Sequence, residues 1–183
     1  SICIPIYNGQ QYIKSTIESV LNQTYSNIDL VLVNDNSTDN TENIILSFKD
    51  KRLRYYKNVK NLGMVANWNK AVSYANGDYV KLLCQDDLLE KTCIEKQAYI
   101  LDINESVQLV TSASYVNDEN GKKLMSRRTF RKSLLLNGKN ISKQSFNKGK
   151  NLFGEPTLTM YRKSIFSKIG YYDKDFWYVP DWD

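Results

Sequence analysis

Residues 1–39, SICIPIYNGQQYIKSTIESVLNQTYSNIDLVLVNDNSTD, carry the clearest pattern of secondary structure in the chain. Its first six residues are almost all apolar, which is typical of a buried strand. Apolar residues then recur at helical spacing at Ile13, Ile17 and Val20, and a second apolar run covers residues 28–33. A strand, a helix and a second strand in this order predict two parallel strands joined by a helical crossover.

The same alternation continues to about residue 112. Further strands are predicted at residues 53–56, 79–84 and 107–112, and helices at residues 64–75 and 91–101. Because repeated strand-helix units pack as a helix-covered sheet, the sequence predicts an α/β fold with a mostly parallel sheet flanked by helices.

Polar side chains follow three of these strands. Tyr7 follows the first strand, Asp35 the second, and the pair Asp86-Asp87 the strand at 79–84. Ligands of open parallel sheets bind beyond the carboxyl ends of the strands. We therefore expect one rim of the sheet to carry an aromatic ring and three carboxylates.

Each of these residues has both a structural and a functional interpretation. Asp86 and Asp87 could simply favour the start of a following helix, and Asp35 could cap the turn after its strand. Alternatively, the carboxylate pair could hold a divalent ion together with substrate phosphates. Asp35 could then accept hydrogen bonds from a base or a ribose, with Tyr7 stacked on the ring.

The composition excludes several classes of protein. The chain has no histidine, which removes Ser-His-Asp and Cys-His catalysis and leaves oxygen ligands for any metal. The three cysteines lack CxxC spacing and indicate free thiols in a reducing compartment. No signal peptide, membrane-spanning run, GxGxxG or P-loop motif is visible. We therefore predict a cytoplasmic protein.

Positive charge is concentrated in residues 122–150, which contain ten Lys or Arg residues and no Asp or Glu. We call this stretch the basic segment. It could be a solvated loop, a lid that touches a diphosphate, or a patch that faces anionic lipid-linked molecules. A nucleic-acid surface is disfavoured because aromatic residues are sparse there.

Short motifs occur in order along the chain: Ile4-Pro5-Ile6-Tyr7-Asn8, Val20-Leu21-Asn22-Gln23-Thr24-Tyr25, Leu32-Val33-Asn34-Asp35-Asn36-Ser37-Thr38-Asp39, Asn61-Leu62-Gly63, Asn69, Gly77-Asp78-Tyr79 and Asp86-Asp87. In these motifs the chain resembles the family-2 glycosyltransferases, which have the Rossmann-like GT-A fold and include many bacterial polysaccharide and O-antigen transferases. The resemblance is dense over residues 1–100, thins between 118 and 150, and returns at Pro156, Tyr161-Arg162 and the terminal acidic motif.

The resemblance implies a donor site and a metal. The residues that would contact the uracil, ribose and sugar of a UDP-type donor are Pro5, Tyr7, Asp35, Asn61 and Asp86. Asp87 would bind the Mg²⁺ or Mn²⁺ ion that bridges the diphosphate.

The resemblance also implies a catalytic base near the end of the chain. Pro180-Asp181-Trp182-Asp183 looks like the family's Glu-Asp motif, whose second acid is the base, so Asp181 is the first candidate and Asp183 the second. A solvated acidic end is the structural alternative. The implied reaction is inverting hexosyl transfer to a saccharide or lipid-linked acceptor by a single displacement.

We expect a nucleotide-sugar-binding GT-A core at 1–116 and an acceptor-side segment at 117–183, with a mobile excursion at about 122–150. We expect the chain to be truncated on the acceptor side, so that any peripheral contact with the inner face of a membrane involves residues beyond 183. No nucleic-acid partner is expected. The rival hypothesis is a non-catalytic module that binds nucleotide sugars or carbohydrate.

Overall fold

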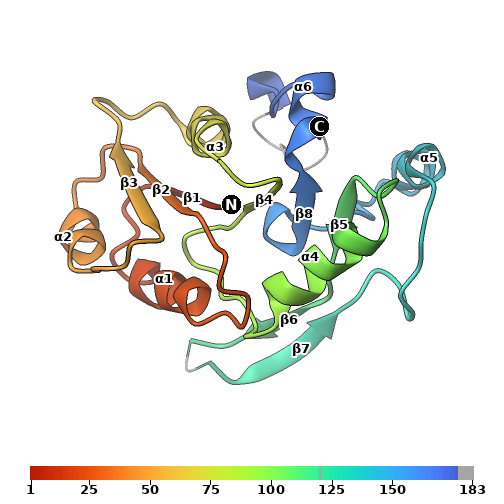
Figure 1. The fold of residues 1–183 in the computed structure, drawn as a ribbon, viewed down its shortest axis with the longest axis horizontal. Coiled ribbons are helices and arrows are strands. Elements are labelled where there is room, and N and C mark those ends of the chain that lie inside the picture. The colour runs from red at the N-terminus through yellow and green to blue at the C-terminus, as the bar shows by residue number, and fades with distance from the viewer. Residues whose placement is uncertain (120, 177–183) are drawn as a thin grey trace.

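The computed structural model describes residues 1–119 and 121–176, and its main sheet has six strands in the order β3-β2-β1-β4-β8-β5 (Figure 1). The strands are β1 Ile2–Ile6, β2 Leu30–Asn34, β3 Leu53–Lys57, β4 Tyr79–Leu82, β5 Leu109–Thr111 and β8 Thr159–Arg162. Strands β1 to β4 are parallel, whereas β8 is antiparallel to both β4 and β5. The predicted α/β fold with a mostly parallel sheet is confirmed.

Helices cover both faces of the sheet (Figure 1). They are α1 Ile13–Leu21, α2 Thr41–Leu46, α3 Met64–Ser73 and α4 Cys93–Ile103. Ile2, Ile4 and Ile6 of β1 pack in one core cluster with apolar residues of α1, α2 and α4, whereas Cys3 packs in a second cluster with α3. This division follows from the strand period of two, which sends alternate side chains to opposite faces.

The order of the strands reverses beside β1. The chain adds β2 and β3 on one side of β1 and then crosses to place β4 on the other side. Such a reversal is a topological switch point, and the crevice beyond it is where open α/β sheets bind ligands.

The region between β5 and β8 lies outside the main sheet. It contains the hairpin of β6 Ser114–Asn117 and β7 Lys123–Arg127, followed by helix α5 Gly138–Lys148. Four short helical elements complete the described chain: η1 Pro156–Leu158, η2 Lys163–Ile165, α6 Phe166–Ile169 and η3 Lys174–Phe176. The sequence predicted no regular element in the basic segment, which in fact contains β7 and α5. Its mobility stays a prediction.

Over the residues that the structure describes, no helix is both long enough and apolar enough to cross a bilayer.

Candidate active site

The carboxyl ends of β1 and β4 separate at the switch point. Their pairing covers only Ile2 and Cys3, and the last backbone bond runs from the Leu83 N–H to the Cys3 carbonyl at 2.9 Å. Pro5, which has no N–H, lies just beyond that point and is buried within β1. A proline is compatible with a central strand here because the β4 side of the ladder has already ended.

Gln85 joins the two strands where the ladder stops. Its Oε1 accepts from the Tyr7 N–H at 2.9 Å, and its Nε2 donates to the Tyr7 carbonyl at 3.1 Å. A Cβ added to Gly9 would lie 2.7 Å from the Gln85 Oε1, so the chain after β1 must pass close to this amide. Gln85 therefore fixes the backbone of Tyr7, whose side chain remains about half exposed at the rim.

The loops after β1 and β2 are strained and cross-linked. Asn8 and Asn36 both have left-handed backbone angles, with φ of 50° and 60°. The Asn8 N–H donates to the Ser37 Oγ at 2.9 Å, and the Asn8 Oδ1 accepts from the Thr38 N–H at 2.9 Å. Non-glycine residues in this conformation cluster at functional sites. Two of them sit together at the predicted rim.

Asp35 is buried and its carboxylate already accepts hydrogen bonds from the chain. Oδ1 accepts from the Asn58 Nδ2 at 2.6 Å and the Leu62 N–H at 2.8 Å, and Oδ2 accepts from the Gly63 N–H at 3.0 Å. These bonds hold the loop that leads into α3 against the end of β2. A carboxylate has about four acceptor positions, so one remains for a ligand.

Asn61 lies exposed on that loop. Its Nδ2 donates to the Asp35 carbonyl at 3.3 Å, and its Oδ1 accepts from the Gly63 N–H at 3.0 Å. Asn61 and Asp35 therefore form one hydrogen-bonded unit at the rim.

Asp86 and Asp87 have different surroundings although they are neighbours. Asp86 is exposed, whereas Asp87 is partly buried and its Oδ2 accepts from the Thr157 hydroxyl at 2.6 Å. Burial raises the pKa of Asp87, and the charge of Asp86 adds to that increase, while the Thr157 hydrogen bond and Lys81 oppose it. A buried carboxylate that is harder to ionise is one that a bound cation would stabilise.

A buried lysine lies behind Asp87. Lys81 points away from the α3 face of β4, and its Nζ donates to the Gln97 Oε1 at 3.1 Å and to the Thr159 carbonyl at 3.2 Å. Burial lowers the pKa of Lys81 to about 8, and electrostatic interactions with Cys93 and Asp87 offset part of that effect. Its ammonium group thus joins β4, α4 and β8 beneath the acidic end of β4.

The predicted site residues can now be placed. Tyr7, Asp35, Asn61, Asp86 and Asp87 lie at the carboxyl edge of the parallel strands, with Pro5 inside β1 next to it. Asp181 and Asp183 lie outside the described residues. Among residues 1–119 and 121–176, no group of three or more acidic or cysteine side chains is arranged to hold a metal.

Sequence reasoning missed the three side chains that organise the rim: Gln85, Thr157 and Lys81. Lys81 could have been found, because a lysine in the middle of an apolar strand needs buried acceptors. Thr157 could not, because its link to Asp87 spans 70 positions of sequence.

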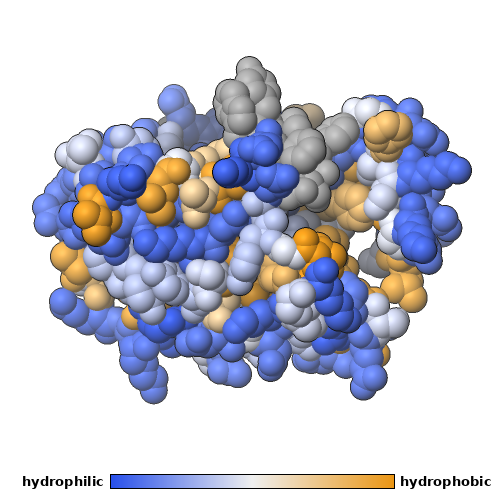
Figure 2. Space-filling model, turned by 90° about the horizontal axis from the view of Figure 1, so that it is seen from above, coloured by the Kyte–Doolittle hydropathy of each residue, from blue (hydrophilic) through white to orange (hydrophobic). Residues whose placement is uncertain are grey.

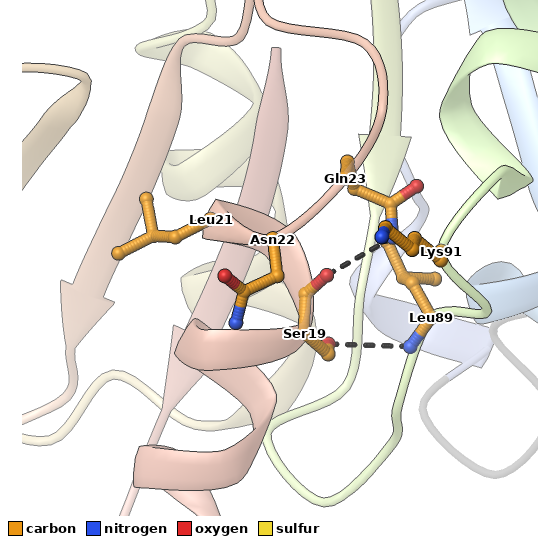
Figure 3. A pocket seen from close by; sticks show the side chains of 6 residues that line it. All are labelled: Ser19, Leu21, Asn22, Gln23, Leu89 and Lys91. Atoms are coloured by element: carbon orange, nitrogen blue, oxygen red, sulfur yellow. Dashed lines mark hydrogen bonds between the residues drawn. The ribbon is translucent and has the colours of Figure 1, made fainter.

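A separate pocket of about 550 Å³ lies between the end of α1 and the loop after β4 (Figure 3). The Ser19 carbonyl accepts from the Gln23 Nε2 at 3.0 Å, and the Ser19 Oγ accepts from the Leu89 N–H at 3.2 Å. These polar groups hold α1 to the loop. None of the predicted site residues lines this pocket.

The fold has close structural relatives. S. aureus TarS 1–349, solved in complex with UDP, superposes with a TM-score of 0.73 at 21% identity and covers 99% of this chain and 52% of that one. The mannosyltransferase PcManGT from Pyrobaculum calidifontis, solved with GDP-Man and Mn²⁺, gives a TM-score of 0.68 at 16% identity and covers 95% of this chain and 47% of that one. The GT-A form of the α/β fold is confirmed.

Sequence comparison identifies the family. A glycosyltransferase of Rickettsia typhi is 31% identical over 188 residues, covering 100% of this chain and 56% of its own length. One of Methanocaldococcus jannaschii is 34% identical, covering 97% of this chain and 62% of its own length. The chain thus spans little more than half of these relatives. The family model for glycosyl transferase family 2 matches residues 1–170, and the chain belongs to that family.

Proposed function

We propose that this chain forms the donor site of a glycosyltransferase that moves a sugar from a UDP-type nucleotide sugar to a saccharide or lipid-linked acceptor. The observation that carries the proposal is that Tyr7, Asp35 and Asp87 follow the carboxyl ends of β1, β2 and β4, three neighbouring parallel strands beside the switch point. Family membership and the UDP and GDP-mannose complexes of its structural relatives support a nucleotide-sugar ligand.

The rim offers a distinct role to each residue. The exposed ring of Tyr7 would stack on the base, and its position is fixed because Gln85 holds its backbone. Asp35 would face the ribose from the end of β2, and Asn61 from the loop before α3 that hydrogen bonds to Asp35 hold in place. Pro5 would contribute only apolar contact. The side chain of Asp86 is exposed and makes no hydrogen bond within the described residues, and it would approach the sugar.

The carboxylate oxygens after β4 are the type of ligand that a hard divalent ion prefers. Asp87 supplies a carboxylate that Thr157 orients, and Asp86 is the only other acid adjacent to it in sequence. With few protein ligands in the described residues, diphosphate oxygens and water would complete the coordination of Mg²⁺ or Mn²⁺. When bound, such an ion neutralises charge on a departing diphosphate.

The reaction we propose is a single displacement that inverts the anomeric carbon. Asp181 would accept the proton of the attacking hydroxyl, and Asp183 is the second candidate for that role. Both assignments rest on the resemblance of the terminal motif to the family.

The donor site is tested by measuring UDP affinity of the full protein calorimetrically, in Mn²⁺ and in EDTA. We expect binding to be at least about tenfold tighter with Mn²⁺ and Asp87→Ala to remove that difference, because metal contacts are worth several kcal/mol. Asp78→Ala is the matched control, since Asp78 precedes β4 whereas Asp87 follows it. Equal affinity of the unaltered protein in Mn²⁺ and EDTA would contradict the metal role.

The catalytic base is tested by transfer assays on Asp181→Asn. We expect turnover to fall about 10²–10⁴-fold with unchanged donor affinity, because the amide cannot accept a proton. If Asp183→Asn is the inactive variant instead, the base is Asp183. If the unaltered protein binds UDP but transfers no sugar to any acceptor, the non-catalytic binding module is the better hypothesis.

A further inference from the structure

The basic segment exposes apolar side chains together with its charge. Leu134, Leu135 and Leu136 form a consecutive exposed run, of which Leu135 is 75% exposed, and Phe146 on α5 is 86% exposed. Runs of three exposed apolar residues are disfavoured in water unless they have a function. In Figure 2 the end of the molecule formed by α5 is hydrophilic with hydrophobic residues set among the polar ones.

Helix α5 has two different faces. Ile141 and Ser145, which are four residues apart, are its buried residues and pack toward the body of the protein. At 3.6 residues per turn, Lys139, Lys143 and Phe146 fall together on the opposite side of the helix. The outward face of α5 therefore combines two cationic side chains with a large apolar one.

The charge of this region is largely unneutralised. The basic segment has ten Lys or Arg residues and no acid of its own. In the described ranges, the ion pairs that reach it are Lys123–Glu90 and Arg127–Glu155, each at 3.1 Å. The other basic residues, including Lys139 and Lys143, are left to attract an anionic partner.

We propose that the basic segment docks this protein on an anionic lipid bilayer. Leu134–Leu136 and Phe146 would enter the interface between headgroups and acyl chains, while Lys139 and Lys143 would lie among the phosphates. This combination of exposed Lys and large apolar side chains in one segment is the pattern of interfacial membrane segments. It suits a bilayer better than a nucleic acid, because three exposed leucines have no function against a phosphate backbone. The proposal goes beyond sugar transfer and does not depend on the donor site.

The test is co-sedimentation of the full protein with vesicles of phosphatidylcholine alone or mixed with phosphatidylglycerol. We expect binding only to the anionic vesicles, decreasing as salt is added. The double variant Lys139→Glu/Lys143→Glu should lower the partition coefficient at least about tenfold, since each basic residue near the surface contributes substantially. Leu135→Ser/Phe146→Ser should lower it by a similar factor because it removes the inserted groups.

The matched control is Lys14→Glu/Lys96→Glu, which makes the same charge change at exposed positions of α1 and α4. It should retain most of the binding, and UDP affinity should be unchanged in all three variants. Absence of vesicle binding, equal binding to neutral vesicles, or equal loss in the control variant would overturn the proposal. Tighter binding to an RNA or DNA oligonucleotide than to anionic vesicles at the same salt would overturn it in favour of a nucleic-acid surface.

Discussion

The main sheet and the basic segment differ in burial and in the pairing of their charged groups. Every residue of β1 and β2 is buried, whereas every residue of β7 is exposed. The sheet fixes its few polar groups with internal partners, as Asp35 and Lys81 show, while the basic segment leaves most of its charge unpaired in the described structure. The sheet can therefore hold polar groups in place for a specific ligand, whereas the basic segment offers charge to attract a partner.

Among variants that test whether internal hydrogen bonds hold the rim in place, we expect the largest loss of stability from a change at Asp35. Asp35→Ala removes an acceptor that the Asn58 Nδ2 and the N–H groups of Leu62 and Gly63 share. The Asn58 Nδ2 keeps the Asn67 Oδ1 and the Gly63 N–H keeps the Asn61 Oδ1, so only the Leu62 N–H is left without an acceptor in the described structure. A hydrogen bond to a charged group contributes about 1.5–3 kcal/mol, and the variant loses three such bonds with partial compensation, so we expect the free energy of unfolding to fall by about 3 kcal/mol. Urea denaturation of the variant and the unaltered protein measures this difference in the free energy of unfolding.

The control for that measurement is Asp86→Ala, which removes an exposed carboxylate from the same rim. It should change stability by less than about 0.5 kcal/mol. Similar effects of the two variants would mean that the hydrogen bonds of Asp35 contribute little and that the rim is not held in place by them.

The same contrast explains what the sequence could predict. The strands β1, β2 and β4 and their helices were predicted because buried apolar residues repeat at a regular spacing, as Ile13, Ile17 and Val20 do. The rim followed from the rule that parallel strands share a carboxyl edge. These inferences depend on local periodicity, which burial imposes directly on the sequence.

Other features left weaker local signals. Helix α5 buries only Ile141 and Ser145, so its apolar periodicity is faint, and its true signals were the cap at Asn137 and the left-handed Gly149. The place of β8 between β4 and β5, and the bond from Thr157 to Asp87, join residues about 50 to 80 positions apart. No local pattern encodes such contacts.

The cost of burying Lys81 within the sheet can be measured by a pH titration, with an expected effect on stability of about 2 kcal/mol. The pKa of Lys81 is lowered to about 8 in the fold, below the ordinary value of 10.5. Between these values the unfolded chain binds a proton that the folded protein has released, so stability rises with pH. Below pH 8 the lysine is charged in both states and the full cost of burial is present.

Lys81→Met provides the reference for this titration, because it removes the titrating group while keeping a similar shape. We expect the stability of the unaltered protein, relative to the variant, to increase by about 2 kcal/mol between pH 7.5 and pH 10. Urea denaturation at both pH values would show it. A constant difference between the two proteins would mean that Lys81 is not desolvated as the structure indicates.

The smallest expected effect concerns the ion pair between the two regions. Lys123 of β7 lies 3.1 Å from Glu90, which follows β4, and both side chains are more than half exposed. Exposed pairs contribute about 0–1 kcal/mol because water and salt screen them. A double-mutant cycle with Lys123→Gln and Glu90→Gln should therefore give a coupling energy below about 0.5 kcal/mol, and added salt should abolish it.

A coupling above about 1 kcal/mol that persists at high salt would mean that Glu90 holds the hairpin firmly to the acidic end of β4. The basic segment would then be an extension of the site, and the contrast between a fixed sheet and a free cationic surface would fail.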